Sequence, residues 1–183
     1  MCASRALLYI FTPLPNSVFG SLQAYLFFKE CALMKSKLIH DACHLLQGEI
    51  SPEAGIHLNL LEDDVQPMTD LLEQYDLHQL RARRLLSIYI AIKVALLRHS
   101  SCDRTITGEA LTRLVLDGDY LYSLYLQLCL EWNEYDLITH LAPVIKQIQI
   151  KRIDGKPDDD KLLKAFELFL KLDHSRNSAS KAI

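Results

Sequence analysis

The sequence predicts an all-α protein with a single domain. Apolar residues recur at helical spacing along most of the chain, whereas no segment of useful length alternates apolar and polar residues as a half-buried strand would. Neither Asp117-Gly118 nor Asp154-Gly155 separates two β-branched runs, so no hairpin is indicated. The length of 183 residues corresponds to about one domain at ~150 residues per domain. Half of the residues are apolar, which suffices for a core without disulfides or metal.

Charge and cysteine usage exclude several classes of protein. The chain has 20 basic and 23 acidic residues, and neither a basic excess nor helix-turn-helix spacing indicates a nucleic-acid partner. The five cysteines are odd in number and include no CxxC pair, which favours the reducing cytoplasm over a disulfide framework. The longest nearly apolar run, Leu85–Leu97, contains Ser87 and Lys93 and is too short for a membrane span, so we expect a buried core helix.

The N-terminal residues 1–20 differ from the rest of the chain. Arg5 precedes the apolar run Ala6–Phe11, which Pro13 and Pro15 cut short, so the run is too short for a signal-peptide core. Residues 1–20 are expected to form a flexible leader, unless the true start is Met34. The predicted domain therefore covers residues 21–172, followed by a frayed tail over 173–183.

The first half of the domain predicts two helical regions. A helix is expected from Ser21, as N-cap, to just before Gly48. Ser51–Pro67 is expected to be a loop with at most one short helix. A second helical region begins near Thr69, and the sequence leaves open whether it continues unbroken into Leu85–Leu97.

The second half predicts three further helices. Thr107–Glu131 is apolar nearly all round, which is typical of a central helix. Glu134–Lys151 follows, with Pro143 removing one backbone donor and predicting a kink. The last helix is expected over Asp160–Leu172.

No group of residues indicates a metal or a self-sufficient active site. His40 and His44 share one helix face, but no third ligand follows at matching spacing, so surface histidines are favoured. A DDxxD helix carries carboxylates at i, i+1 and i+4, whereas a proline or a leucine stands at i+4 after the pairs in Glu62–Asp64 and Asp158–Asp160. No GxSxG, P-loop or GxGxxG motif occurs. We therefore predict no catalytic residue and no metal site in this chain.

The segment Asp117–Tyr120 is the most informative part of the sequence. A glycine inside a helix costs up to ~1 kcal/mol relative to alanine, so Gly118 predicts that a neighbouring backbone comes close. Asp119 follows on a helix with little other polarity, and we expect it to pair with a cation or a donor across a helix contact. Tyr122 and Tyr125 come next along the helix.

This segment carries a family resemblance. Residues 114–125 read LVLDGDYLYSLY and resemble the VLAGDYxSxxYY segment of the small component of two-component bacterial polyprenyl (heptaprenyl-type) diphosphate synthases. Residues 136–148 continue the resemblance, similar to IxLIRxLAxAIKEIN. The likeness covers roughly Leu85–Arg152, and Asp117 stands where the family usually has alanine.

The resemblance implies a fold and a function. It implies part of the all-α isoprenoid synthase fold and a heterodimer with a catalytic subunit of the component 2 type. That partner carries two DDxxD motifs, binds Mg²⁺, and elongates farnesyl diphosphate with isopentenyl diphosphate for the menaquinone side chain. The small component completes the interface and shapes the product tunnel, and it meets the diphosphates only in the complex and the membrane only transiently, through the product. Carried over by position, the interface or tunnel residues are Gly118, Asp119, Tyr120, Tyr122 and Tyr125.

Two other functions stay open at this point. The chain could be a self-sufficient small prenyltransferase that uses unrecognised acids, although metal-assisted departure of diphosphate needs the missing carboxylates. It could also be an unrelated helical interaction or adaptor module. Under the leading hypothesis the chain is a regulatory subunit that is inactive alone and holds no cofactor.

Overall fold

The computed structural model describes residues 37–58, 60–75, 77–102, 105–156, 158 and 160–180, which belong to one compact unit. The described residues contain no strand, so the predicted all-α class is confirmed. Residues 37–49 are helical and are followed by a 3₁₀ turn, η1, over Pro52–Ala54. The other helices are α2 (Glu62–Gln74), α3 (Gln79–Ser100), α4 (Gly108–Glu131), α5 (Tyr135–Ile153) and α6 (Asp160–Ser180). The predicted leader and the first part of the first helix lie outside the described residues.

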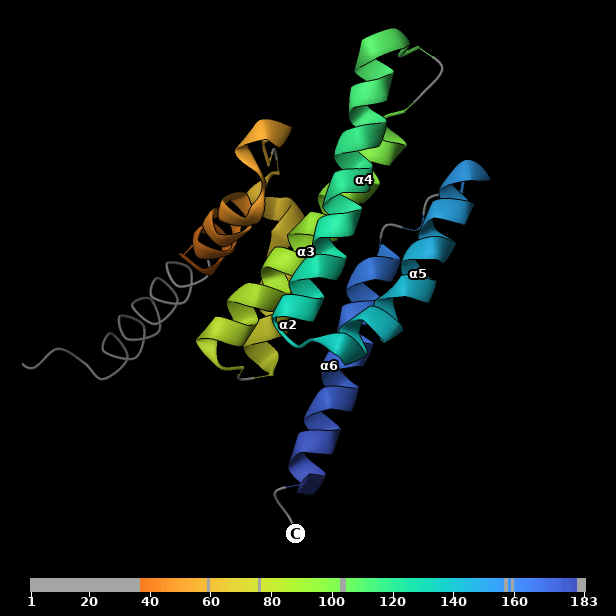
Figure 1. The fold of residues 1–183 in the computed structure, drawn as a ribbon. Helices are drawn as coiled ribbons and strands as arrows, with labels where there is room; N and C mark the ends of the chain where they lie inside the picture. The colour runs from red at the N-terminus through yellow and green to blue at the C-terminus, as the bar shows by residue number, and fades with distance from the viewer. Residues whose placement is uncertain are drawn as a thin grey trace, which may run out of the picture. The chain divides into compact units, whose positions relative to one another are not determined.

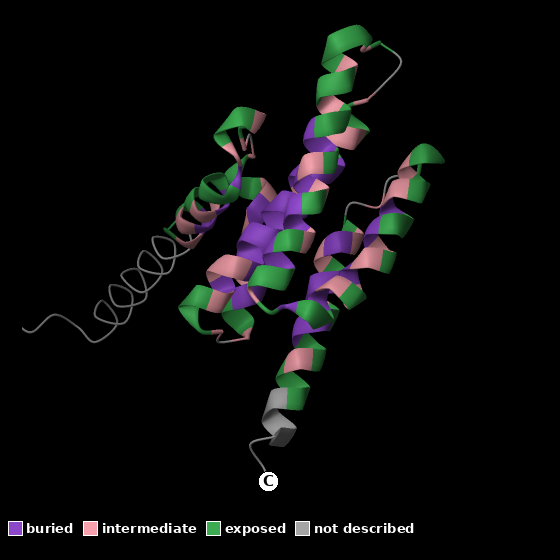
Figure 2. Cartoon of the chain, in the orientation of Figure 1, coloured by how far each residue is buried: buried purple, intermediate pink, exposed green. Residues whose placement is uncertain are grey.

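The core is built around α3. This helix packs along α4, and α5 packs along α6 (Figure 1). Buried residues are concentrated on α3 (Figure 2), where every position from Leu85 to Leu96 except Lys93 is buried. The buried Ser87 hydroxyl lies 3.0 Å from the Ala42 carbonyl of the helix over 37–49 and 2.9 Å from the Arg83 carbonyl, so a polar side chain is accommodated in this core. The prediction of a buried core helix here is confirmed.

The helix predicted to be central, α4, is only half covered. Its inner face buries Leu121 and Leu128, but Leu116 and Leu130 on the opposite side are 59% and 53% exposed. The prediction of a central α4 is therefore wrong for the described part of the chain. An apolar pattern around a helix does not reveal whether its outer face is covered within the same chain or by a partner chain.

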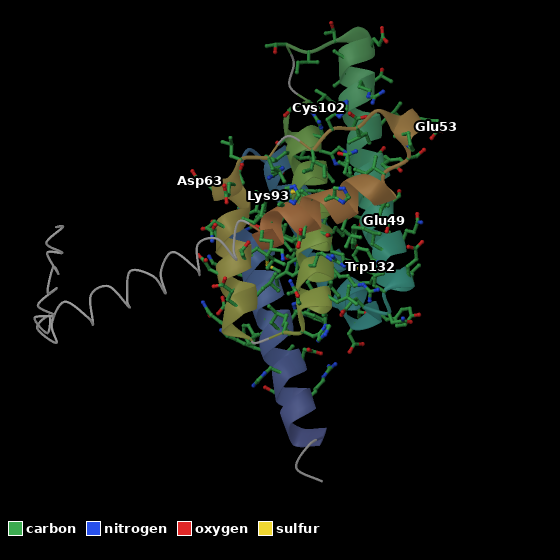
Figure 3. The ribbon with its side chains drawn as sticks, turned by 90° about the vertical axis from the view of Figure 1, so that its left-hand side faces the viewer. Glu49, Glu53, Asp63, Lys93, Cys102 and Trp132 are labelled. Atoms are coloured by element: carbon green, nitrogen blue, oxygen red, sulfur yellow. The ribbon has the colours of Figure 1, made fainter. Side chains whose placement is uncertain are left out.

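Helix α2 begins seven residues earlier than predicted, at Glu62. The acidic residues of its first turn suit the positive end of the helix dipole. Lys93 of α3 donates to the Asp64 carbonyl at 2.6 Å and lies 3.5 Å from the Asp64 carboxylate, which holds this turn in place. Figure 3 labels Lys93 and Asp63, the residue before Asp64. Pro67 lies inside the helix. The short helix that the prediction allowed within Ser51–Pro67 is η1, but the loop does not continue to Pro67 as expected. It ends at Leu61 because these tertiary contacts stabilise the first turns of α2.

Other boundaries differ by less. The helix over residues 37–49 includes Gly48 instead of ending before it. A break follows Gln74, and α3 begins where the His78 Nδ1 atom accepts a hydrogen bond from the Leu80 amide at 3.3 Å. The structure therefore answers the open question of continuity: α2 and α3 are two helices. Pro143 lies within α5 as expected.

Arg81 at the start of α3 joins three parts of the fold. Its guanidinium donates to both carboxylate oxygens of Glu134, at 2.7 and 2.9 Å, and to Asp173 of α6 at 2.6 Å. The hydrogen bond to Glu134 is the main reason that the pKa of Arg81 is raised above its ordinary value. Arg176, one turn beyond Asp173, pairs with Asp136 at 2.6 Å. These pairs explain why α6 continues to Ser180, past its predicted end at Leu172.

Alkaline pH is expected to destabilise the fold through Tyr89. Burial, with smaller effects of Asp64 and Asp160, raises the pKa of Tyr89 to about 12 from an ordinary value of about 10. Between these values the unfolded chain loses the phenolic proton while the native protein keeps it, so stability falls as pH rises, by on the order of 2 kcal/mol. Urea unfolding at pH 9, 10 and 11 measures this slope. Tyr89→Phe should reduce the slope without abolishing it, because burial also raises the pKa of Tyr125 and Cys129. Tyr135→Phe, at an exposed position, should leave the slope unchanged. Equal slopes for the wild type and Tyr89→Phe would contradict the assignment.

None of the described helices is both long enough and apolar enough to cross a lipid bilayer.

Candidate functional site

All five predicted site residues lie on α4, and at Gly118 this helix meets a side chain of α3. A Cβ atom on Gly118 would lie 2.3 Å from Nε2 and 2.4 Å from Cδ2 of His99. No side chain fits at such distances, so the imidazole ring occupies the space that glycine leaves. The sequence predicted the approach of a backbone; the structure places a side-chain ring there instead.

Asp119 binds the same histidine from the next position. Its Oδ1 atom lies 3.1 Å from Nε2 of His99. The Asp119 side chain is 64% exposed and that of His99 25% exposed, so the pair lies at the edge of the helix contact. The expected partner across a helix contact is therefore His99. Gly118 admits the ring, and Asp119 orients it.

Asp117 and Tyr120 of α4 hold the loop that contains η1 against this helix. The Tyr120 hydroxyl accepts a hydrogen bond from the Ser51 amide at 2.8 Å. Asp117 is buried and pairs with Nε of Arg113, one turn earlier, at 2.8 Å, and Arg113 in turn donates to the Ala54 carbonyl. Asp117 therefore positions an arginine on this loop.

Residues 117–120 together form a structural junction, which we call the α4 junction. Tyr120 binds the loop directly and Asp117 does so through Arg113, while the two central members contact His99 of α3. Arg98 of α3 adds a third anchor by donating to the His57 carbonyl at 3.2 Å. The junction thus connects the loop after the first helix with both helices of the α3–α4 pair.

The two tyrosines that follow the junction differ in their surroundings. Tyr125 is fully buried, and its ring packs edge to face against Tyr122 with centroids 5.1 Å apart. Burial raises the pKa of Tyr125, and the neighbouring Tyr122 phenol adds to the effect. Tyr122 is half-buried and packs against the core from its edge. Within this chain Tyr125 is a core residue, and Tyr122 is the one that retains exposed surface.

The charged candidates elsewhere do not assemble into a site. Within the described ranges, no three His, Cys, Asp or Glu residues are placed to hold a metal ion. The rings of His40 and His44 lie 6.4 Å apart on one helix face. Asp158 pairs with Lys151 at 2.7 Å, and this hydrogen bond holds the pKa of Asp158 below its usual range.

The sequence predicted the residues of the α4 junction but not the residues that they contact. His99, Arg113 and Ser51 are distant from one another in the sequence and carry no common motif. One local signal was present, because Arg113 and Asp117 are spaced i, i+4 on a helix, where opposite charges attract. The chain matches no known family model, no curated protein and no solved structure.

Proposed function

We propose that this chain is the non-catalytic, regulatory subunit of a heterodimeric long-chain polyprenyl diphosphate synthase of the heptaprenyl type. The residues that carry the resemblance, roughly 85–152, fall on the consecutive helices α3, α4 and α5. Their Gly-Asp-Tyr centre includes the two residues of α4 that contact His99 of α3. This placement supports a role in building a helical scaffold.

The observation that carries the proposal is the resemblance of residues 114–125 and 136–148, and two exposed leucines on the outer side of α4 add to it. Leu116, Leu130 and Val115 are 59%, 53% and 39% exposed on the helix that carries the resemblance. Helical spacing places Leu116 and Leu130 on one side of α4, away from the buried Leu121, with the exposed Ser123 and Gln127 between them. Burial of these side chains against a partner chain would be favourable, at about 25 cal/mol per Å² removed from water. We assign that partner as the catalytic subunit.

The proposal divides the chemistry between two chains. The partner's two DDxxD motifs would bind Mg²⁺, which assists departure of the diphosphate from the allylic substrate. This chain has no carboxylate triplet at DDxxD spacing, and the two carboxylates of the α4 junction are already paired with Arg113 and His99. Its contribution is the interface and the shape of the complex, and it should be inactive alone.

A prenyl-transfer assay tests this proposal. Farnesyl diphosphate, radiolabelled isopentenyl diphosphate and Mg²⁺ are incubated with the chain alone and with the DDxxD-bearing subunit from the same genome. Long products only in the mixture are expected. Products from the chain alone would favour a self-sufficient small prenyltransferase, and no association with the partner would favour the helical adaptor module.

A matched pair of variants locates the interface. Leu116→Glu on the outer face of α4 should weaken association about tenfold or more, because it buries a charge against the partner. Leu168→Glu on α6 is the control, since its side chain is 51% exposed, close to the 59% of Leu116. Both variants should unfold at the wild-type temperature. Unchanged association of Leu116→Glu would show that this face does not bind the partner.

A further inference from the structure

The helix over residues 37–49 carries the only two histidines that stand four positions apart in the sequence, His40 and His44. In an α-helix this spacing brings two side chains onto one face, one turn apart. The two rings lie nearly parallel, with an angle of 24° between their planes and 6.4 Å between their centroids. Both residues are exposed, so two imidazoles are held side by side on an accessible surface.

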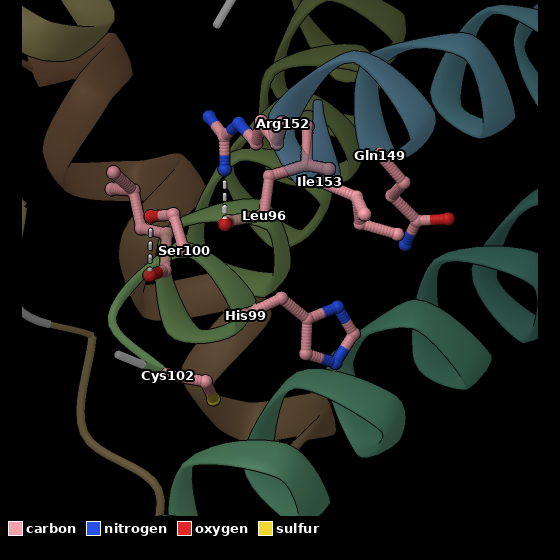
Figure 4. Close-up of a pocket in the computed structure, with 8 residues that line it drawn as sticks. Leu96, His99, Ser100, Cys102, Gln149, Arg152 and Ile153 are labelled. Atoms are coloured by element: carbon pink, nitrogen blue, oxygen red, sulfur yellow. Dashed lines mark hydrogen bonds between the residues drawn. The ribbon is translucent and has the colours of Figure 1, made fainter. Parts of the chain in front are cut away.

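Three other histidines are already engaged within the fold. His99 borders a cavity between the C-terminal ends of α3 and α5, where it turns its ring toward α4 (Figure 4). The Asp119 carboxylate lies 3.1 Å from the Nε2 atom of this ring. His78 caps α3 through its Nδ1 atom, and a ring nitrogen of His140 lies 2.9 Å from a backbone carbonyl of α6. These rings serve the packing of the helices.

The ring nitrogens of the exposed pair are available instead. The Asp41 carboxylate lies 3.6 Å from Nδ1 of His40, so it borders that side of the ring and leaves Nε2 open. Within the described part of the chain, no hydrogen bond or ion pair occupies the ring nitrogens of His44. Histidines that bind a metal typically have a carboxylate or a carbonyl beside the second ring nitrogen, which orients the ring. Asp41 takes this place beside His40.

The spacing of the two rings suits chelation of one ion. A metal–nitrogen distance of about 2.0–2.1 Å places the centroids of two chelating rings about 5 Å apart, so the rings must approach each other by about 1 Å. The side chain of His40 is 78% exposed and His44 is exposed too, so both can turn. Because no three His, Cys, Asp or Glu residues in the described ranges could hold a metal ion, water completes the coordination.

We propose that His40 and His44 form a binding site for a divalent transition metal ion, held by two imidazole nitrogens and otherwise by water. Imidazole suits Ni²⁺, Cu²⁺ and Zn²⁺, whereas Mg²⁺ and Ca²⁺ prefer oxygen ligands. The site therefore differs in its chemistry from the Mg²⁺ site expected on the catalytic partner. The inference holds or fails independently of the proposed synthase subunit.

Calorimetric titration of the whole, untagged chain with Ni²⁺ tests the proposal. One Ni²⁺ per chain should bind saturably, and an equal concentration of Mg²⁺ should not compete. Because the helix holds the two imidazoles together only in the folded protein, saturating Ni²⁺ should also raise the unfolding temperature. A lack of saturable binding, or equal competition by Mg²⁺, would overturn the proposal.

Four variants assign the ligands. His40→Gln and His44→Gln should each weaken Ni²⁺ binding about tenfold or more, because each leaves a single imidazole. His57→Gln, at another exposed histidine, and Cys43→Ser, at the half-buried thiol between the pair, should leave the affinity unchanged. Without metal, all four variants should unfold close to the wild-type temperature. Binding that persists in either variant of the pair, or that is lost in Cys43→Ser, would overturn the assignment.

Discussion

Gly118→Ala is expected to destabilise the wild-type protein but to stabilise a His99→Ala variant. In the wild type the new methyl group meets the imidazole ring at 2.3–2.4 Å, so the ring must move and its contact with Asp119 is lost. We expect a cost of about 1–2 kcal/mol, and about 3 kcal/mol for Gly118→Leu, whose longer side chain has no space to occupy. Urea unfolding of the single and double variants gives these values directly.

The change of sign arises from two opposing effects. Alanine is preferred over glycine inside a helix by up to about 1 kcal/mol. In the His99→Ala background the imidazole ring is absent, so nothing opposes the helix preference for alanine. Gly118→Ala should therefore raise the free energy of unfolding by up to about 1 kcal/mol. The resulting double-mutant cycle measures the Gly118–His99 contact separately from helix propensity.

Gly48 provides the matched control for this prediction. It also lies in a helix, and a Cβ atom there would have nothing within 4 Å. Gly48→Ala should therefore stabilise the wild-type protein, by up to about 1 kcal/mol. If Gly118→Ala behaves in the same way in both backgrounds, His99 does not explain the glycine.

The sequence predicted the junction residues but not their partners, for a physical reason. A glycine and an aspartate on an apolar helix indicate a close contact, because both residues are costly there without one. Which group fills the contact depends on the register between α3 and α4, and helical periodicity contains no information about register. His99 therefore emerged only from the structure.

The helix boundaries were likewise predictable only where they depend on local sequence. Those of α4 and α5 agree with local patterns to within two residues because capping and periodicity are local. The early start of α2 and the late end of α6 depend on partners far along the chain, namely Lys93 for Asp64 and Arg81 for Asp173. Local patterns could not predict these ends.

Arg81→Met is expected to be strongly destabilising, by about 3 kcal/mol. The substitution keeps the apolar stem but leaves the Glu134 carboxylate, whose side chain is 10% exposed, without its two hydrogen bonds. An unpaired carboxylate with so little access to water is costly, and breaking a buried pair typically costs about 3–5 kcal/mol. We take the lower end because the Arg81 side chain is 30% exposed. Thermal and urea unfolding measure the loss.

Two further variants separate the cost of leaving a buried carboxylate unpaired from the cost of losing an ion pair at the surface. Arg176→Met breaks the ion pair with Asp136, which is 2.6 Å long. The side chains of Arg176 and Asp136 are 67% and 73% exposed, so the loss of stability should stay below about 1 kcal/mol. Arg81→Met with Glu134→Gln should recover much of the lost stability, because a neutral amide tolerates the site better than an unpaired carboxylate. If the double variant is no more stable than Arg81→Met, the cost arises from the loss of Asp173 and the docking of α6. The comparison therefore decides whether Arg81 acts mainly as the counterion of Glu134 or as the link between α3 and α6.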